Sequence, residues 1–246
     1  MSEPSTTLVQ TSNPVKPPWT ALGFAMAFPT VLTLAYFVLL AGRQRALIQV
    51  VYTLGKVVQF GFPLAWTAWS TGRFPQPSLP GRRGAGVGFA FGIAILAGAL
   101  TLHTTLLGAT GGLEGGVAAA VQAKVAAFGV TSPRRFLALG AFYSLLHSAA
   151  EEYYWRWFVF GELRRAVRAS TAVVVSSAAF ASHHLIILGT FFGWTSPWTP
   201  ALTLAVAVGG AFWAWLYHRS GSLLGPWISH MLVDAAIFAV GYQLAF

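Results

Sequence analysis

The chain has 246 residues, of which 56% are hydrophobic and 9% are charged, against roughly 25% charged residues in an ordinary soluble domain. This composition excludes a typical soluble protein and indicates an integral membrane protein. The formal charge of +9 does not indicate nucleic-acid binding, because the basic residues stand at the ends of apolar stretches, where topology signals and lipid-headgroup contacts are expected. The absence of cysteine excludes disulfides, thiolate metal sites and a cysteine nucleophile.

Long apolar stretches follow a short polar tail. Residues 1–18 are polar and proline-rich, and we expect a disordered tail there, followed by a single transmembrane helical-bundle domain over residues 19–246. The apolar stretches suit helices that cross about 30 Å of hydrocarbon, which takes roughly 20 residues, and they lack the alternation of barrel strands. The predicted fold class is therefore all-α, with about seven transmembrane helices and room for an eighth. The predicted spans are Trp19–Ala41, Leu47–Trp69, Gly84–Leu107, Phe136–Phe160, Thr171–Phe192, Ala201–Tyr217 and Leu223–Leu244.

One polar segment separates the third and fourth spans. Residues 111–130 carry Glu114, Gln122 and Lys124 among small residues, and this favours an amphipathic helix at the membrane interface. The tail and the loops after the second, fourth and sixth spans carry more lysine and arginine than the loops on the other side. This excess favours a cytoplasmic N-terminus.

The fourth predicted span contains charged residues that do not suit a bilayer. A charged side chain near the bilayer centre costs roughly 2.5–3.5 kcal/mol on insertion scales, so such residues need partners and a reason to be retained. Glu152 and Arg156 are four residues apart and share a helical face, whereas Glu151 is rotated by about 100° from Glu152. Arg156 therefore cannot pair equally with both, so one glutamate is expected to be structural and the other available. His147, four residues before Glu151, could hydrogen-bond to it.

Two later spans carry further ionisable residues. The fifth span holds His183 and His184, and the last holds His230 and Asp234 on one helical face. A salt bridge or a His–Asp hydrogen bond between helices would account for each pair taken alone. Three helices that together contribute Glu, His, His and Asp are instead typical of a hydrolytic site inside a bundle. We expect His183 to point away from this site, because it is adjacent to His184.

At these residues the chain resembles the glutamic intramembrane proteases that include the type II CAAX prenyl endopeptidases and their bacterial relatives, called the CPBP or Abi family. The family's EExxxR, FxxxH and HxxxN or HxxxD motifs stand here as EEYYWR, FASHH and HMLVD, in the family's order. The resemblance covers roughly the second half of the chain. It implies a protease whose site residues are Glu151, Glu152, Arg156, His184, His230 and Asp234.

The resemblance also implies roles for these residues. Glu151 and His184 would activate a water that attacks the scissile carbonyl, while His230 and Asp234 would stabilise the oxyanion. An ionised aspartate cannot donate a hydrogen bond, so Asp234 must be protonated or must act by orienting His230. No cofactor and no metal ion is implied. The implied partners are a membrane-associated protein or peptide substrate and the lipid bilayer, with no nucleic acid.

Two other interpretations remain open at this stage. Glu, His, His and Asp could bind zinc in a membrane metalloprotease, although there is no HExxH motif and Arg156 would stand beside the metal. The polar cluster could also belong to a non-catalytic scaffold, transporter or immunity protein, although no inverted repeat is found. The substrate is open among a prenylated tail, a C-terminal sorting signal, a leader and a bacteriocin-related target. The preference for Arg over Lys and the many Ala and Gly residues favour a GC-rich bacterial genome, and hence a location in a bacterial inner membrane.

Overall fold

The computed structural model of this protein describes residues 18–75, 81–107, 116–127, 129–130 and 132–246. Within these residues it is all-helical, which confirms the predicted fold class. The predicted tail lies outside the described residues except for Pro18. The α-helices and π-helical segments (η) are α1 (Trp19–Leu34), η1 (Ala35–Leu39), α2 (Arg45–Thr71), α3 (Ala85–Leu102), η2 (His103–Leu107), α4 (Gly116–Ala127), α5 (Pro133–Phe142), η3 (Tyr143–His147), α6 (Ser148–Glu152), η4 (Tyr153–Phe160), α7 (Gly161–Ala166), α8 (Ala169–Phe192), α9 (Trp198–Ser220) and α10 (Leu224–Ala245).

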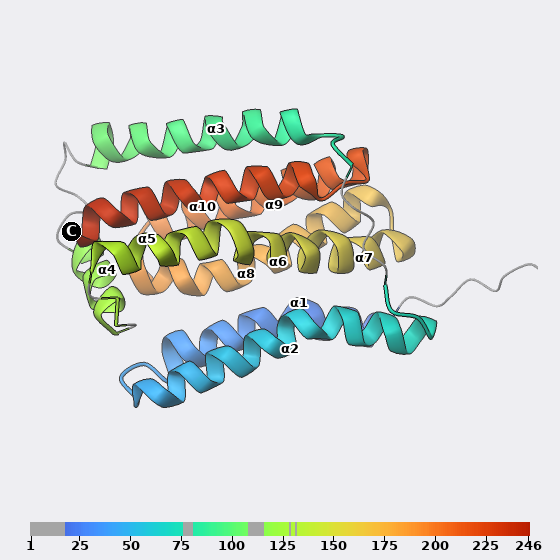
Figure 1. Ribbon diagram of the computed structural model, residues 1–246, viewed down its shortest axis with the longest axis horizontal. Helices are drawn as coiled ribbons and strands as arrows, with labels where there is room; N and C mark the ends of the chain where they lie inside the picture. Colours follow the sequence, from blue (N-terminus) through green and yellow to red (C-terminus); the bar gives the residue numbers. More distant parts are fainter. Residues whose placement is uncertain (1–17, 76–80, 108–115, 128, 131) are drawn as a thin grey trace, which may run out of the picture.

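Most of the predicted spans are long helices in the structure. Among the described residues, six helices are long and apolar enough to cross a membrane, and they correspond to six of the predicted spans. The remaining predicted span, Phe136–Phe160, lies in the run from α5 to α7, where α-helical and π-helical turns follow one another as one long rod (Figure 1). This rod carries Glu151, Glu152 and Arg156 in its middle, and the predicted number of seven spans is therefore approximate.

The predicted interfacial helix of residues 111–130 is present in part as α4. Residues 111–115 and 128 of that prediction lie outside the described residues. Alanines occur on all sides of α4, so its apolar residues are not concentrated on one face. The prediction that this helix is amphipathic is therefore wrong. α4 lies at one end of the bundle, where it contacts α8 and α10 (Figure 1).

Several helix ends follow from local sequence signals. α5 begins after Ser132, whose side chain accepts a hydrogen bond from the backbone N–H of Arg135, with Pro133 in the first helical position. α2 and α9 end at Gly72 and Gly221, which adopt positive φ angles of 67° and 66°. Glycine adopts this conformation without the steric penalty of a Cβ, so both helices can stop there.

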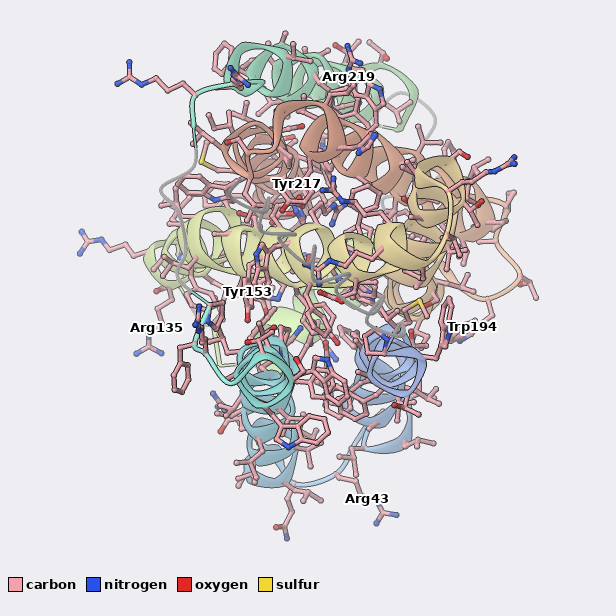
Figure 2. All side chains as sticks on the ribbon, turned by 90° about the vertical axis from the view of Figure 1, so that its right-hand side faces the viewer. Arg43, Arg135, Tyr153, Trp194, Tyr217 and Arg219 are labelled. Carbon is pink, nitrogen blue, oxygen red and sulfur yellow. The ribbon has the colours of Figure 1, made fainter. Side chains whose placement is uncertain are left out.

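The rod from α5 to α7 forms the centre of the molecule. Its segments contact α1, α2, α8, α9 and α10, while α3 lies on the outside against α10 (Figure 1). Tyr154, Trp155 and Phe158 of the rod are completely or almost completely buried. In the view along the bundle, Arg43 and Arg135 are directed away from it (Figure 2). The charged residues in the middle of the rod are thus surrounded by protein and not by lipid.

α3 packs closely on α10 through glycines. A Cβ added at Gly88 would collide with the backbone of Gly225, whereas one added at Gly86 would meet no atom within 4 Å. Close approach of two helices through small residues is a common way to associate in membranes, where dispersion contacts drive packing. This contact attaches α3 to the rest of the bundle.

We therefore expect Gly88→Ala to lower the stability of the protein, because the backbone of Gly225 cannot move aside as a flexible side chain would. Overpacking of this kind costs typically about 1–3 kcal/mol. Thermal unfolding of the detergent-solubilised protein measures the effect. Gly86→Ala is the matched control, since it changes the same residue type on the same helix without a collision. Equal melting temperatures for the two variants would contradict the proposed packing.

Candidate active site

Glu152 is held by two partners inside the protein. Its Oε2 lies 3.2 Å from Nε of Arg156, one helical turn away, and its Oε1 accepts a hydrogen bond of 2.8 Å from Nδ1 of His230. Glu152 is 0% exposed and Arg156 is 2% exposed. The predicted pairing of Glu152 with Arg156 is confirmed, and Glu152 is the structural glutamate.

Arg156 is also enclosed by aromatic rings from two other helices. Its guanidinium carbon lies 4.7 Å from the ring centroid of Phe180 on α8 and 4.9 Å from that of Trp213 on α9. Cations over aromatic faces are stabilised by the ring quadrupole, and the effect grows when both are desolvated. Arg156 therefore joins the central rod to α8 and α9.

His230 is fixed in orientation by its surroundings. Its ring is stacked on Trp213, with centroids 4.2 Å apart and planes inclined by 16°. The indole N–H of Trp213 in turn donates a hydrogen bond of 2.8 Å to Oγ of Ser229. Because a carboxylate only accepts, Nδ1 of His230 carries the proton toward Glu152. This leaves Nε2 on the other side of the ring, 3.7 Å from Glu151 Oε2 and 3.7 Å from Asp234 Oδ1.

Glu151 has a different environment from its neighbour. Besides His230, its carboxylate faces Nε2 of His183 at 3.7 Å and Nε2 of His147 at 3.9 Å. All these contacts are longer than the 2.8 Å hydrogen bond between Glu152 and His230, so the carboxylate of Glu151 is surrounded by imidazoles but held less closely than that of Glu152. The predicted hydrogen bond from His147 is replaced by this longer contact. Glu151 is the available glutamate.

The two adjacent histidines of α8 differ from expectation. The prediction that His183 points away from the site is wrong, because His183 approaches the carboxylate of Glu151 and its ring lies parallel to that of Trp155. His184 instead turns its Nδ1 to the carbonyl oxygen of Phe180, 3.0 Å away. Residue spacing could not reveal this, because the packing of Trp155 decides where the ring of His183 lies.

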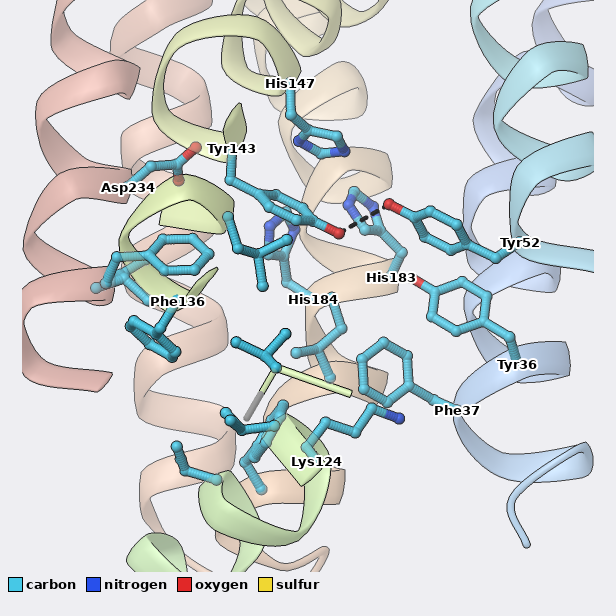
Figure 3. A pocket seen from close by; sticks show the side chains of 18 of the residues that line it. Tyr36, Phe37, Tyr52, Lys124, Phe136, Tyr143, His147, His183, His184 and Asp234 are labelled. Carbon is cyan, nitrogen blue, oxygen red and sulfur yellow. Dashed lines mark hydrogen bonds between the residues drawn. The ribbon is translucent and has the colours of Figure 1, made fainter. Parts of the chain in front are cut away.

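A cavity of about 320 Å³ lies in front of Glu151. The cavity has a polar part, with His147, His183, His184 and Asp234, and an apolar part lined by residues such as Phe136 and Phe37 (Figure 3). The predicted site residues thus fall into two groups. Glu151, His184 and Asp234 line the cavity, while Glu152, Arg156 and His230 are not among its lining residues and support it from behind.

The cavity also contains residues that the sequence analysis missed. Tyr52 and Tyr143 hydrogen-bond to each other through their hydroxyls at 2.8 Å (Figure 3), and Tyr36 and Lys56 also line the wall. Lys56 had a detectable signal, because a lysine in the middle of the second predicted span is as costly as the charges that were noticed in the fourth. The tyrosines had none, since tyrosine is common in membrane helices and near their ends.

π-helical turns flank the glutamates. η3 ends at His147 and η4 begins at Tyr153, so the short helix α6 with both carboxylates lies between them. π-helical turns are rare and occur often at functional sites, because the extra residue changes the direction of the side chains that follow. This feature agrees with a functional site at α6.

Comparison with known families agrees with the motifs. The family model described as type II CAAX prenyl endopeptidase Rce1-like matches residues 133–236, which contain all six predicted site residues. This part of the chain is Rce1-like, and the resemblance to the CPBP family inferred from the motifs is confirmed over it. The match supports a protease of the CAAX type, with a protein or peptide substrate and a membrane setting. No curated protein matches the chain. No solved structure matches it either.

The buried cluster generates a prediction about stability. Glu152→Gln and Arg156→Ala should each lower the folded yield and the melting temperature, because each leaves a charge without its partner in apolar surroundings. Removing one partner of a buried ion pair costs about 3–5 kcal/mol. Size-exclusion profiles and thermal unfolding in detergent measure the effect.

The control is Arg165→Ala. It breaks the exposed ion pair between Arg165 and Glu162, whose N···O distance is 2.9 Å. Surface substitutions of this kind usually change stability by no more than about 0.5 kcal/mol. If Arg156→Ala were as stable as Arg165→Ala, the structural role of the buried pair would be wrong.

Proposed function

We propose that this protein is an intramembrane endopeptidase of the glutamic type, in which Glu151 activates a water for attack on a peptide bond of a membrane-associated protein or peptide. The observation that carries the proposal is the unequal treatment of two adjacent glutamates. Glu152 is bound to Arg156 at 3.2 Å and to His230 at 2.8 Å, while Glu151 lines the cavity and contacts imidazoles only at the longer distances of 3.7 and 3.9 Å. A carboxylate in this position can accept a proton from a water in the cavity.

The proposed reaction uses groups that face the cavity. Glu151 takes a proton from the water, whose oxygen bonds to the scissile carbonyl carbon as the carbonyl electrons move to oxygen. His184 uses Nδ1 toward the carbonyl oxygen of Phe180, so Nε2 of its neutral ring keeps a lone pair that can accept a hydrogen bond from the same water. The intermediate then breaks its C–N bond, and Glu151 returns the proton to the leaving amine.

The oxyanion needs hydrogen-bond donors close to Glu151. Asp234 lines the cavity, and Nε2 of His230 lies 3.7 Å from both Asp234 and Glu151. In the proposed state His230 carries protons on both nitrogens and Asp234 is protonated. In this state both His230 and Asp234 can donate to an oxyanion.

The other interpretations have less support from the geometry. Glu152 contacts the cation Arg156 at 3.2 Å and does not line the cavity, so it is a poor candidate for a metal ligand. A non-catalytic scaffold gives no reason for a carboxylate held only by long contacts beside a cavity. We propose further that the protein works in the inner membrane of a bacterium, as its Arg-, Ala- and Gly-rich composition favours.

Glu151→Gln should abolish cleavage while the protein remains folded, because the amide keeps the shape and cannot act as a base. Proteomic comparison of membrane-protein termini in cells with the wild-type chain and with this variant measures the activity. Loss of a general base lowers the rate by typically 10²–10⁴-fold. The wild-type activity should survive a metal chelator. Normal processing by Glu151→Gln, or complete loss with a chelator, would overturn the proposed mechanism.

Asp234→Asn should preserve or raise activity, because an amide donates a hydrogen bond at every pH and adds no negative charge near the oxyanion. The alternative role, an anion that orients His230, predicts a loss. A hydrogen bond to a charged group is worth about 1.5–3 kcal/mol, which corresponds to roughly a ten- to hundredfold lower rate. Steady-state rates with the substrates found by the terminal comparison distinguish the two. A large loss with an intact fold would assign the oxyanion to His230 alone.

A further inference from the structure

Helix α9 contributes no residue to the proposed reaction, yet one of its side chains lies against the buried cluster. Trp213 is 4% exposed, whereas Trp215, two residues further along the same helix, is 46% exposed. Tryptophan in a membrane helix usually lies near the interface, where its N–H can meet water or headgroups. Trp213 instead contacts Arg156 of the central rod, Phe180 of α8 and His230 of α10. Its position inside the bundle needs a reason.

The imidazole of His230 needs more than one contact to hold its orientation. Its Nδ1 is held by Oε1 of Glu152 at 2.8 Å, but the χ2 torsion of histidine has broad minima, so the ring can tilt about this single hydrogen bond. Trp213 restricts the tilt, because the two rings are stacked with centroids 4.2 Å apart and planes inclined by 16°. Phe180 meets the same imidazole edge-on, with centroids 6.0 Å apart. The hydrogen bond and the ring contacts together determine where Nε2 lies.

Trp213 is itself tied to the helix that carries His230. Its indole N–H donates a hydrogen bond of 2.8 Å to Oγ of Ser229, which is 0% exposed. Ser229 directly precedes His230 on α10, so the indole and the imidazole are positioned by the same helical turn. Sliding the indole along the imidazole would leave a buried N–H without an acceptor, which is costly.

The position of Nε2 of His230 matters for the proposed reaction. It lies 3.7 Å from Oε2 of Glu151 and 3.7 Å from Oδ1 of Asp234, where the oxyanion is expected to form. A donor stabilises an oxyanion only at roughly 2.7–3.1 Å from it. A misplacement of about 1 Å can lower the rate about a hundredfold. A group that holds the imidazole therefore affects the rate although it does not touch the substrate.

We propose that Trp213 is a positioning residue of the proteolytic reaction, which holds the imidazole of His230 through its ring face and its hydrogen bond to Ser229 so that Nε2 faces the oxyanion. The inference rests on the proposed function, because it assigns a support to a donor of that reaction. Trp213 is not among the residues that line the cavity, so it acts through His230 and not on the substrate. It also lies outside the EExxxR, FxxxH and HxxxD motifs.

NMR spectroscopy of the full chain in detergent, with isotope-labelled histidine, tests whether Trp213 holds the ring. The proton on Nδ1 of His230 is hydrogen-bonded to a carboxylate, so its signal should lie downfield of the backbone amide protons and be absent in His230→Asn. Trp213→Leu should abolish this signal, because the ring then samples several orientations. Trp213→Phe should retain it in weakened form, since an aromatic face remains.

The rate of cleavage tests whether this orientation matters for the reaction. The probe is the membrane proteome of cells in which each variant is induced, and the measured quantity is the rate at which new protein termini appear per folded protein. Trp213→Leu should lower this rate about 10- to 100-fold, which is less than the about 10²–10³-fold of losing an oxyanion donor outright. Trp213→Phe should recover part of the loss. Ser229→Ala should lower the rate roughly two- to tenfold, as expected for one neutral hydrogen bond.

Trp215→Leu is the matched control, because it makes the same substitution on the same helix at an exposed position. Both the signal of Nδ1 and the rate should stay at the wild-type level. Thermal unfolding of each variant separates positioning from folding. If Trp213→Leu does not fold, Trp213→Phe and Ser229→Ala decide the matter, since each removes one partner of the indole hydrogen bond and keeps the imidazole.

A double variant separates an effect through His230 from a general effect on packing. In the background of His230→Asn, Trp213→Leu should cause no further loss of rate, because residues that act as a unit are not additive. A further loss by the same factor would overturn the inference. A wild-type rate in Trp213→Leu, a signal of Nδ1 that persists in this variant, and a wild-type chain without that signal would each overturn it too.

The outcomes also distinguish this inference from the proposed function. The signal of Nδ1 depends on the contact between the two rings and not on cleavage. Its persistence in Trp213→Leu rejects the positioning role and leaves the role of Glu151 intact. Processing by Glu151→Gln rejects the proposed function without changing the signal.

Discussion

The structure depends on the ion pair between Glu152 and Arg156 inside an apolar bundle. In low-dielectric surroundings a charge left alone is far more costly than one that is paired and hydrogen-bonded, so this pair restricts the packing around it. Arg156 contacts rings of Phe180 on α8 and Trp213 on α9, and Glu152 accepts a hydrogen bond from His230 on α10. This one buried pair thus connects the central rod to the three helices α8, α9 and α10.

The same pair explains how two adjacent glutamates can differ in role. Glu152 is occupied by its contacts with Arg156 and His230, whereas Glu151, which the helix turns to a different side, remains in the cavity wall. Nε2 of His230 then lies between Glu151 and Asp234 because Nδ1 is held by Glu152. The support behind the cavity therefore sets the positions of the groups in front of it, as preorganised electrostatic sites require.

The wall opposite Glu151 comes from another part of the chain. Tyr36, Tyr52 and Lys56 belong to α1–η1 and α2, outside the residues 133–236 that match the Rce1-like family. The matched segment carries the groups proposed for chemistry, whereas the N-terminal helices contribute a tyrosine pair and a cation to the cavity. A division of this kind allows substrate preference to change without a change in the hydrolytic groups, because binding and chemistry involve different helices.

The sequence by itself determined the membrane class, the helical fold and most helix boundaries, because hydrophobic length, glycine stops and the cap at Ser132 act locally. It also determined the pairing of Glu152 with Arg156, because residues four apart on a helix must be neighbours. Only the tertiary structure decided that His183 approaches Glu151, that His230 binds Glu152, and that Lys56 lines the same cavity. These relations join side chains from different helices, and they depend on how the helices are rotated and packed, which no spacing within one helix specifies.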